Sequence, residues 1–172
     1  MDLRRIEFMK AVHLRLLLLS NDPNDFGIVV PTVAFDAQHL EELDERSRLP
    51  SIHIMQGSVG AIDEGPTPDT GDLGDIVEVF PVLLRCTVKG PTHGEDEKLI
   101  EKKSFQAIRL RHGIEKVLVA RPGRNVLGVP GIVDTSLTTF SLPQVRENWG
   151  SPWLAIEFNY HIIHTYRKGE PV

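Results

Sequence analysis

The sequence contains a single cysteine, Cys86, among its 172 residues. No intrachain disulfide can form, and one unpartnered thiol is typical of a protein made in a reducing compartment. Long apolar runs are also missing. The nearest approach, residues 14–19, is interrupted by Arg15 and is too short to span a bilayer or to act as a secretory signal. We therefore expect a soluble protein that is made in the cytoplasm.

Motifs that carry catalysis are absent as well. There is no Gly-rich phosphate-binding motif, no nucleophile elbow and no cysteine pair at zinc spacing. Cys86 falls on the apolar face of its expected strand, which predicts an inert buried thiol rather than a nucleophile paired with a histidine. Asp134 and Glu157 are candidates for paired carboxylates, but nothing in the sequence places them together. We expect no enzymatic activity and no cofactor.

One histidine pair, His161 and His164, has a spacing that can ligate a metal when it lies on a helix. A metal site completed by His112 or Glu157 is the alternative that would make the chain a small metal-dependent enzyme. On a strand, however, residues three apart face opposite sides. The pattern favours a solvated His161 and a His164 at the end of a sheet, so we expect no metal.

An excess of positive charge is also missing, since 19 Lys and Arg residues stand against 24 Asp and Glu, for a net charge of -5. This balance argues against a protein that binds nucleic acid by neutralising phosphates, although it does not exclude a surface past which DNA slides. The apolar fraction of 41% and the charged fraction of 25% are those of a globular protein. The length fits one domain over residues 1–172.

What the sequence does contain is β-strand periodicity. Residues 153–167 alternate between an apolar and a polar face and are rich in β-branched and aromatic side chains, which predicts a long strand. Residues 76–89 predict a second long strand, in which Pro81 indicates a bulge or a partly unpaired edge. Two shorter strands are expected at residues 51–56 and 133–142.

Two helices are expected beside these strands. The first covers residues 2–19, with an inner stripe of Leu3, Ile6, Met9, His13, Leu16 and Leu17. The second starts from a capping box of Thr92 and Glu95 and ends near Ala120. Its expected inner stripe is Ile100, Ala107, Ile108, Ile114, Val117 and Leu118. Gly113 within it marks close packing or a bend.

Two segments read as insertions or loops. Residues 20–50 contain turn formers, a short strand at residues 28–33 that Pro31 places at an edge, and a short helix capped by Asp36. Residues 57–75 contain no Lys or Arg and predict an exposed, mobile acidic loop. Its acidic residues are Asp63, Glu64, Asp69, Asp72 and Asp75. The expected fold class is α+β: a mainly antiparallel sheet of about four strands packed against helices, with an extra N-terminal segment and an acidic inter-strand loop.

The order of these elements resembles that of the tail terminator (tail completion) proteins of long-tailed bacteriophages. The resemblance covers the first helix and most of the chain from about residue 51 onward. Besides that helix and the second one, it rests on the stretches Ser51-Ile-His-Ile-Met-Gln-Gly57, Val79-Phe-Pro-Val-Leu-Leu-Arg-Cys86, Phe140-Ser-Leu-Pro-Gln-Val145, Pro152-Trp-Leu-Ala-Ile-Glu-Phe-Asn-Tyr160 and Tyr166-Arg-Lys168.

The resemblance implies a structural virion protein that forms a homohexameric ring. Such a ring caps the tail tube, ends its elongation and provides the attachment surface for the head-connector (stopper) protein. Genomic DNA passes through its lumen without specific binding. The protein would be assembled in the host cytoplasm, reside in the tail or neck of the virion and contact no membrane. Another neck or head-completion ring protein is the alternative within the same structural class.

Two sets of residues are expected to serve this ring. The acidic loop would line the lumen, where Asp63, Glu64, Asp69, Asp72 and Asp75 would repel DNA phosphates. A closed ring also needs two different surfaces that fit one another. Phe8, Val12 and Leu19 widen the apolar stripe of the first helix, and Tyr166 and Arg167 lie at the protruding end of the last strand. We expect these five residues at the subunit or partner interface.

Overall fold

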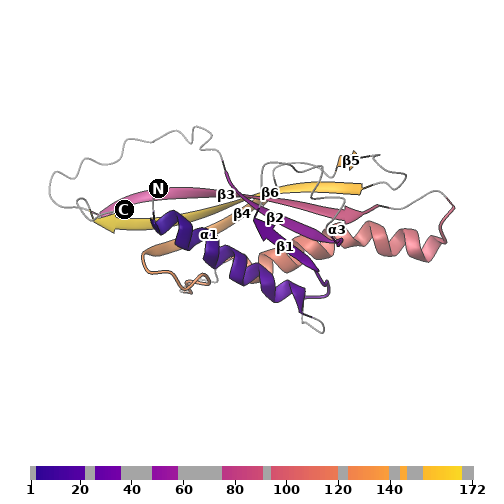
Figure 1. Ribbon diagram of the computed structural model, residues 1–172, viewed down its shortest axis with the longest axis horizontal. Coiled ribbons are helices and arrows are strands. Elements are labelled where there is room, and N and C mark those ends of the chain that lie inside the picture. The colour runs from indigo at the N-terminus through magenta and orange to yellow at the C-terminus, as the bar shows by residue number, and fades with distance from the viewer. Residues whose placement is uncertain are drawn as a thin grey trace.

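The computed structural model describes residues 3–21, 26–35, 48–57, 75–90, 94–119, 124–139, 144–146 and 153–167. In chain order their elements are α1 (Leu3–Leu16), the 3-10 helix η1 (Leu17–Ser20), β1 (Thr32–Phe35), β2 (Ser51–Gln56), β3 (Asp75–Lys89), α3 (Glu97–Leu118), β4 (Ile132–Thr139), β5 (Gln144–Arg146) and β6 (Trp153–Arg167). The helices pack against a mainly antiparallel sheet, as Figure 1 shows. The predicted α+β fold class is confirmed.

The sheet is built around β3 and β6. These two strands pair antiparallel over all 15 residues of each, from Asp75 opposite Arg167 to Lys89 opposite Trp153. Around them the strand order is β1-β2-β3-β6-β4, and β5 pairs with the first residues of β6. Only β1 and β2 run parallel among the described strand pairs. The described sheet therefore has six strands. They are the expected four, β1 near the short strand predicted at residues 28–33, and the unpredicted β5.

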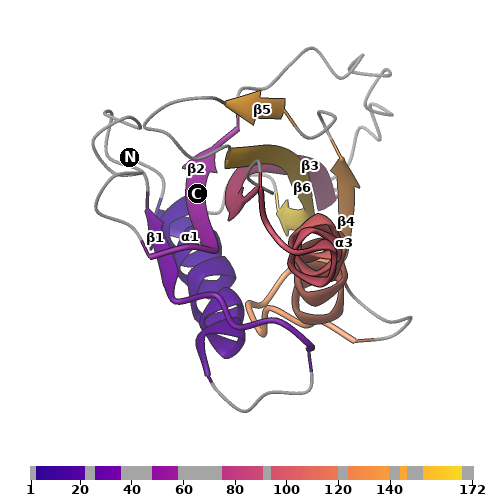
Figure 2. The same cartoon turned by 90° about the vertical axis from the view of Figure 1, so that its right-hand side faces the viewer.

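One face of the sheet carries the core, because alternate side chains of a strand share a face. Both helices pack against this face, inside the curl of the sheet that Figure 2 shows. The side chains that the two central strands bury there are Phe80, Val82, Leu84, Cys86, Val88, Ile156, Phe158, Tyr160, Ile162 and His164. The alternation predicted for these strands is thus the alternation observed.

Pro81 lies where β2 ends. The last β2–β3 pair joins Gln56 to Val82, and the Gly57 amide then donates to the Pro81 carbonyl at 3.0 Å. Proline lacks an N–H, and this position beyond the end of β2 needs no further ladder bond. Pairing with β6 continues through Pro81 in unbroken register, so the predicted one-sided pairing is present and the bulge is not. A Cβ at Gly57 would come within 2.9 Å of the Pro81 Cβ, which requires glycine there.

Helix α1 buries a face that coincides only in part with the predicted one, through Leu16 and the half-buried Met9. Its buried residues, with those of η1, are Phe8, Ala11, Val12, Leu16 and Leu19, whereas Leu3 of the predicted stripe is exposed. The predicted side is covered in part by β1. There the His13 ring lies 4.8 Å from the Phe35 ring, and its Nε2 lies 3.2 Å from the Val33 carbonyl oxygen. Apolar residues occur around most of this helix, so their spacing alone does not select the inner face.

Helix α3 matches its predicted length more closely than its predicted start. Asp96 is the N-cap, without a side-chain capping bond, and the helix ends at Leu118. Gly94, at φ 84°, forms a turn before it, so the predicted capping box of Thr92 and Glu95 does not open the helix. Leu110, Ile114, Val117 and Leu118 are buried, but Ile108 of the predicted stripe is exposed.

Gly113 confirms the predicted close packing. A Cβ there would meet Leu19 Cδ2 at 3.2 Å and Ile28 Cγ2 at 3.3 Å. This glycine lets α3 approach the turn that follows α1 more closely than an alanine would.

Some predicted bounds shift. Strand β1 begins four residues later than predicted but is an edge strand, and β4 covers residues 132–139 rather than 133–142. The short helix predicted after Asp36 lies outside the described residues, as does the acidic loop except Gly57 and Asp75. No helix in the described part of the chain is both long enough and apolar enough to cross a membrane.

Candidate functional site

The structure separates the two histidines considered as metal ligands. His161 lies opposite Pro81 and Ser136 on the outer face of β6, and His164 lies opposite Glu78 and Ile132 on the core face. Residues three apart on a strand must diverge in this way. Within the described residues, no cluster of three or more His, Cys, Asp or Glu side chains is arranged to hold a metal ion. The metal-dependent alternative therefore loses its two central ligands.

Asp134 and Glu157 do not form a carboxylate pair. Asp134 pairs with Ile163 of β6, six residues from Glu157, which places them about 20 Å apart along the sheet. Glu157 instead accepts a hydrogen bond from Arg85 Nε at 2.8 Å and forms an ion pair with the same guanidinium.

Cys86 is fully buried, and desolvation raises the pKa of its thiol. A buried thiol with a raised pKa is a poor nucleophile. The prediction of an inert Cys86 is confirmed.

A buried histidine at the end of the sheet joins α1 to β3. The Glu78 carboxylate accepts a hydrogen bond from Arg5 at 3.1 Å, and its second oxygen lies 3.4 Å from His164 Nε2. The ring of Phe8 lies 4.8 Å from the His164 ring and 5.8 Å from that of Phe80. This arrangement fixes the N-terminal half of α1 on the sheet, which is a structural role.

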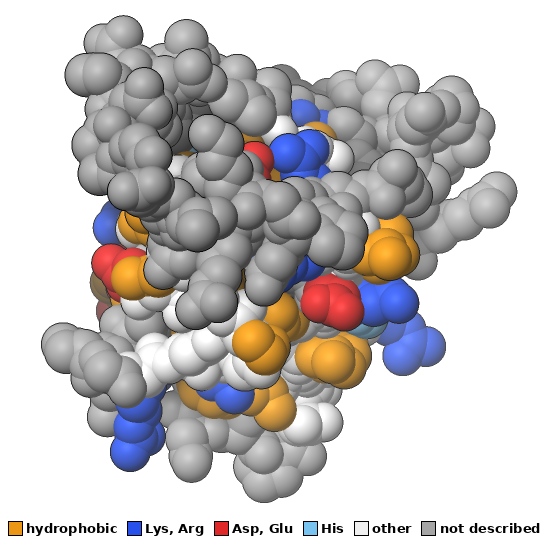
Figure 3. Space-filling view, turned by 90° about the vertical axis from the view of Figure 1, so that its left-hand side faces the viewer, with side chains coloured by type: hydrophobic (Ala, Val, Ile, Leu, Met, Phe, Trp, Pro, Cys, Tyr) orange, Lys and Arg blue, Asp and Glu red, His pale blue; other side chains and the backbone are white. Residues whose placement is uncertain are grey.

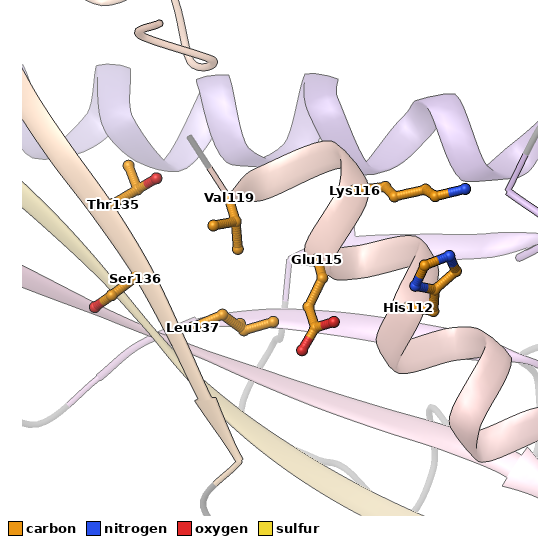
Figure 4. Close-up of a pocket in the computed structure, with 7 residues that line it drawn as sticks. All are labelled: His112, Glu115, Lys116, Val119, Thr135, Ser136 and Leu137. Carbon is orange, nitrogen blue, oxygen red and sulfur yellow. The ribbon is translucent and has the colours of Figure 1, made fainter. Parts of the chain in front are cut away.

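Two hollows lie beside the helices. The larger, of about 530 Å³, lies between α3 and β4. Figure 4 shows Glu115 pointing into it toward Leu137, whereas His112 and Lys116 point the other way along α3. The smaller, of about 420 Å³, lies between α1 and residues 127–130. Neither hollow combines a nucleophile with a base within hydrogen-bonding distance, as acyl-transfer or hydrolytic chemistry would require.

Exposed apolar side chains are found on α1, η1 and β1, where they are Leu14, Leu18 and Phe35, and also toward both ends of the long axis. At one end, Leu3 is 72% exposed, Val77 is 57% exposed and Val133 is 65% exposed. We call these three residues the β-end surface, because β3 and β4 begin there. Arg5 of α1 contacts Glu78 beside Val77, and Ile132 pairs with His164 across the same end of β6. Figure 3 views this end and shows separate hydrophobic side chains among charged ones.

At the opposite end, α3 extends past the end of the sheet (Figure 1). Phe105 is 44% exposed and Ile108 is 62% exposed in the third and fourth turns of this helix. We call these two residues the helix-end surface. Sequence reasoning placed Ile108 in the inner stripe. At about 100° per residue, however, Ile108 lies roughly 120° around the helix from Ile114, and this offset could have identified it as exposed.

The predicted interface residues of the first helix need correction. Phe8, Val12 and Leu19 are buried in the chain's own core at 1% exposure or less. The rings of Phe80 and His164 lie beside Phe8. Gly113 of α3 lies beside Leu19. The same chain thus covers these residues, so they offer no surface to a neighbour. Tyr166 and Arg167 are in β6 opposite Ile76 and Asp75, and the placement of their side chains lies outside the described residues.

The predicted lumen-lining residues fall almost entirely beyond the described structure. Asp63, Glu64, Asp69 and Asp72 lie outside the described residues, and Asp75 is placed only as the first residue of β3. Their assignment to a lumen stays a prediction.

Comparison with known proteins assigns no family. No protein-family model matches the chain, and no curated protein sequence matches it.

Proposed function

We propose that the chain is a structural subunit of a long-tailed phage that closes with copies of itself into a hexameric ring. The ring would cap the tail tube, end its elongation and offer an attachment surface to the head connector. The resemblance to tail terminator proteins supports this proposal, because α1, β2, β3, α3, β4 and β6 follow one another in the order on which the resemblance rests.

The observation that carries the proposal is the exposure of apolar side chains at two opposite ends of the molecule. The β-end surface and the helix-end surface are built from different elements. A β-end surface that contacts the helix-end surface of a neighbour cannot contact a second β-end surface at the same time. Contact between unlike ends is heterologous, and repetition of such a contact generates a ring when the rotation closes. This geometry fits a ring better than a two-fold dimer.

The magnitudes indicate that the ring needs a template. Complete burial of an apolar side chain is worth roughly 1.5–3 kcal/mol, and these five are already partly buried, so the gain per contact is on the order of 5–10 kcal/mol. Association costs an estimated 4–15 kcal/mol in lost translation and rotation. The two terms nearly cancel. We therefore expect a monomer at low concentration that assembles on the end of a tail tube.

Light scattering tests the proposal. The solution mass is measured over a range of concentration and salt, with and without purified tail tubes. A discrete hexamer, or a monomer that becomes one when tubes are added, is the expected result. A monomer that never binds tubes would overturn the assignment. Co-sedimentation with tubes, rather than with filled heads alone, separates a tail terminator from another ring of the neck.

A further inference from the structure

Four cations form a straight ribbon along α3. Lys98, Lys102, Arg109 and Lys116 occupy positions i, i+4, i+11 and i+18 of this helix. At about 100° per residue, these positions fall within roughly 40° of one another around the helix axis. At about 1.5 Å per residue, the ribbon is about 27 Å long. We call these four residues the α3 ribbon.

The α3 ribbon is exposed in the free subunit. Phe105 of the helix-end surface lies about 20° from Lys98 around the helix, between Lys102 and Arg109 along it. The ribbon is therefore accessible over its whole length only in a subunit whose helix-end surface is not covered by a neighbour.

All four side chains of the ribbon are exposed. The large side chains that α3 buries, Leu110, Ile114, Val117 and Leu118, lie about 60–160° around the helix from Lys102, all on one side of the ribbon. The buried Gly113 lies about 20° from Lys102. None of the four forms an ion pair with a carboxylate that the structure describes. Figure 4 shows the last of them, Lys116, pointing away from β4.

The acidic residues of α3 lie off the ribbon. Glu97, Glu101 and Glu115 are each about 60° or more around the helix from Lys98, all displaced in the same direction. Glu115 is also engaged by Arg111 at 3.0 Å. Glu101, three residues after Lys98, is the nearest acidic neighbour of the ribbon. Glu97 and Glu115 lie about 100° around the helix from Lys98.

The net charge of -5 is a sum over the whole chain. It does not report the electrostatic field at the surface of α3, which depends on where the charged residues lie.

We propose that the α3 ribbon binds the sugar–phosphate backbone of duplex DNA without reading its sequence. A straight row of cations about 27 Å long suits a regular polyanion, and the same length of B-DNA carries about sixteen phosphates on its two strands. Backbone contacts from Lys and Arg position a protein on DNA but do not specify bases. The ribbon is thus a site for any duplex of sufficient length.

Counterion release sets the expected salt dependence. Four phosphate contacts give a slope of about -3.6 in a plot of log affinity against log salt concentration. Raising the salt from 50 to 200 mM should therefore weaken binding on the order of 100-fold. The dissociation constant at physiological salt is expected in the range of about 10⁻⁴–10⁻⁶ M that is typical of sequence-independent binding.

Fluorescence anisotropy with a labelled 30-base-pair duplex of arbitrary sequence tests this inference. The ribbon variant Lys98→Gln/Lys102→Gln/Arg109→Gln/Lys116→Gln keeps good helix formers at exposed positions, so it should fold. The matched control, Lys10→Gln/Arg48→Gln/Lys89→Gln/Arg124→Gln, removes the same charge from exposed positions elsewhere. Circular dichroism and thermal unfolding of both variants verify the fold.

The ribbon variant is expected to lose at least tenfold in affinity at 50 mM salt and most of the salt slope, while the control loses less than threefold. Equal losses in the two variants would show that net charge alone governs binding and would overturn the assignment to α3. Absence of DNA binding by the wild-type chain at 50 mM salt would overturn it as well. The experiment uses no tail tubes, so its failure leaves the test of the proposed ring untouched.

Discussion

The Tyr160 hydroxyl, deep in the core, donates a hydrogen bond of 2.7 Å to the carbonyl oxygen of Leu118, the last residue of α3. Helices leave their final carbonyl groups without a partner inside the helix. A side chain from β6 thus completes the end of α3 and joins the helix to the centre of the sheet. Thr135 Oγ1 of β4 donates to the same carbonyl at 3.2 Å.

Substitution Tyr160→Phe should lower the free energy of unfolding by about 1 kcal/mol, because it removes one of these two donors and keeps the ring. Urea unfolding measures the change. Because Thr135 still serves the carbonyl, the double variant with Thr135→Val should lose more than the sum of the single losses. Strict additivity would show that the two donors do not share the Leu118 carbonyl.

Substitution Glu157→Gln should cost on the order of 1 kcal/mol. Its ion pair with Arg85 is largely shielded from solvent, with side chains 18% and 23% exposed, and a hydrogen bond to a charged group is stronger than a neutral one. Substitution Glu115→Gln, which breaks the exposed pair with Arg111, is the matched comparison and should cost only a few tenths of a kcal/mol. Equal losses in urea unfolding would contradict the role of burial.

Stability should fall in alkaline solution through Cys86. Burial raises the pKa of this thiol above its usual value of 9.0, so above that pH the unfolded chain loses a proton that the folded chain keeps. The unfolded state is then favoured by about 1.4 kcal/mol for each further pH unit. Below pH 9 the contribution is constant. Unfolding measured from pH 8 to pH 10 should show a steeper decline for the wild type than for Cys86→Ala, and equal slopes would contradict it.

The proposed contact between unlike ends makes a mixing prediction. Val77→Thr/Val133→Thr weakens the β-end surface, and Phe105→Gln/Ile108→Gln weakens the helix-end surface. Cross-linking in the presence of tail tubes should give neither rings nor dimers for each variant alone. A mixture should give dimers, because each variant keeps the end that the other lacks. Dimers of a single variant would instead indicate a two-fold contact between like ends.

Strand periodicity was the part of the fold that could be predicted from the sequence. The last strand was predicted at residues 153–167 and is observed there, and β2 also has its predicted bounds. Side chains alternate between faces whatever the neighbouring strand is, so the local pattern already decides which face is buried. The inert Cys86 and the divergence of His161 from His164 followed from the same parity.

Only the tertiary structure decided how the helices face. Phe8 and Leu19, predicted at a subunit interface, are in the core. Apolar residues occur around most of this helix, so their spacing does not decide whether the same chain or a neighbour buries a given side chain. Ile108 is exposed because it faces away from the side of α3 on which Ala107 and Leu110 pack against the core. The α3 ribbon likewise depends on which side of α3 the rest of the chain leaves exposed. The net charge of the chain cannot reveal this ribbon. Net charge does not depend on where the charged residues lie, whereas the electrostatic field at a surface does.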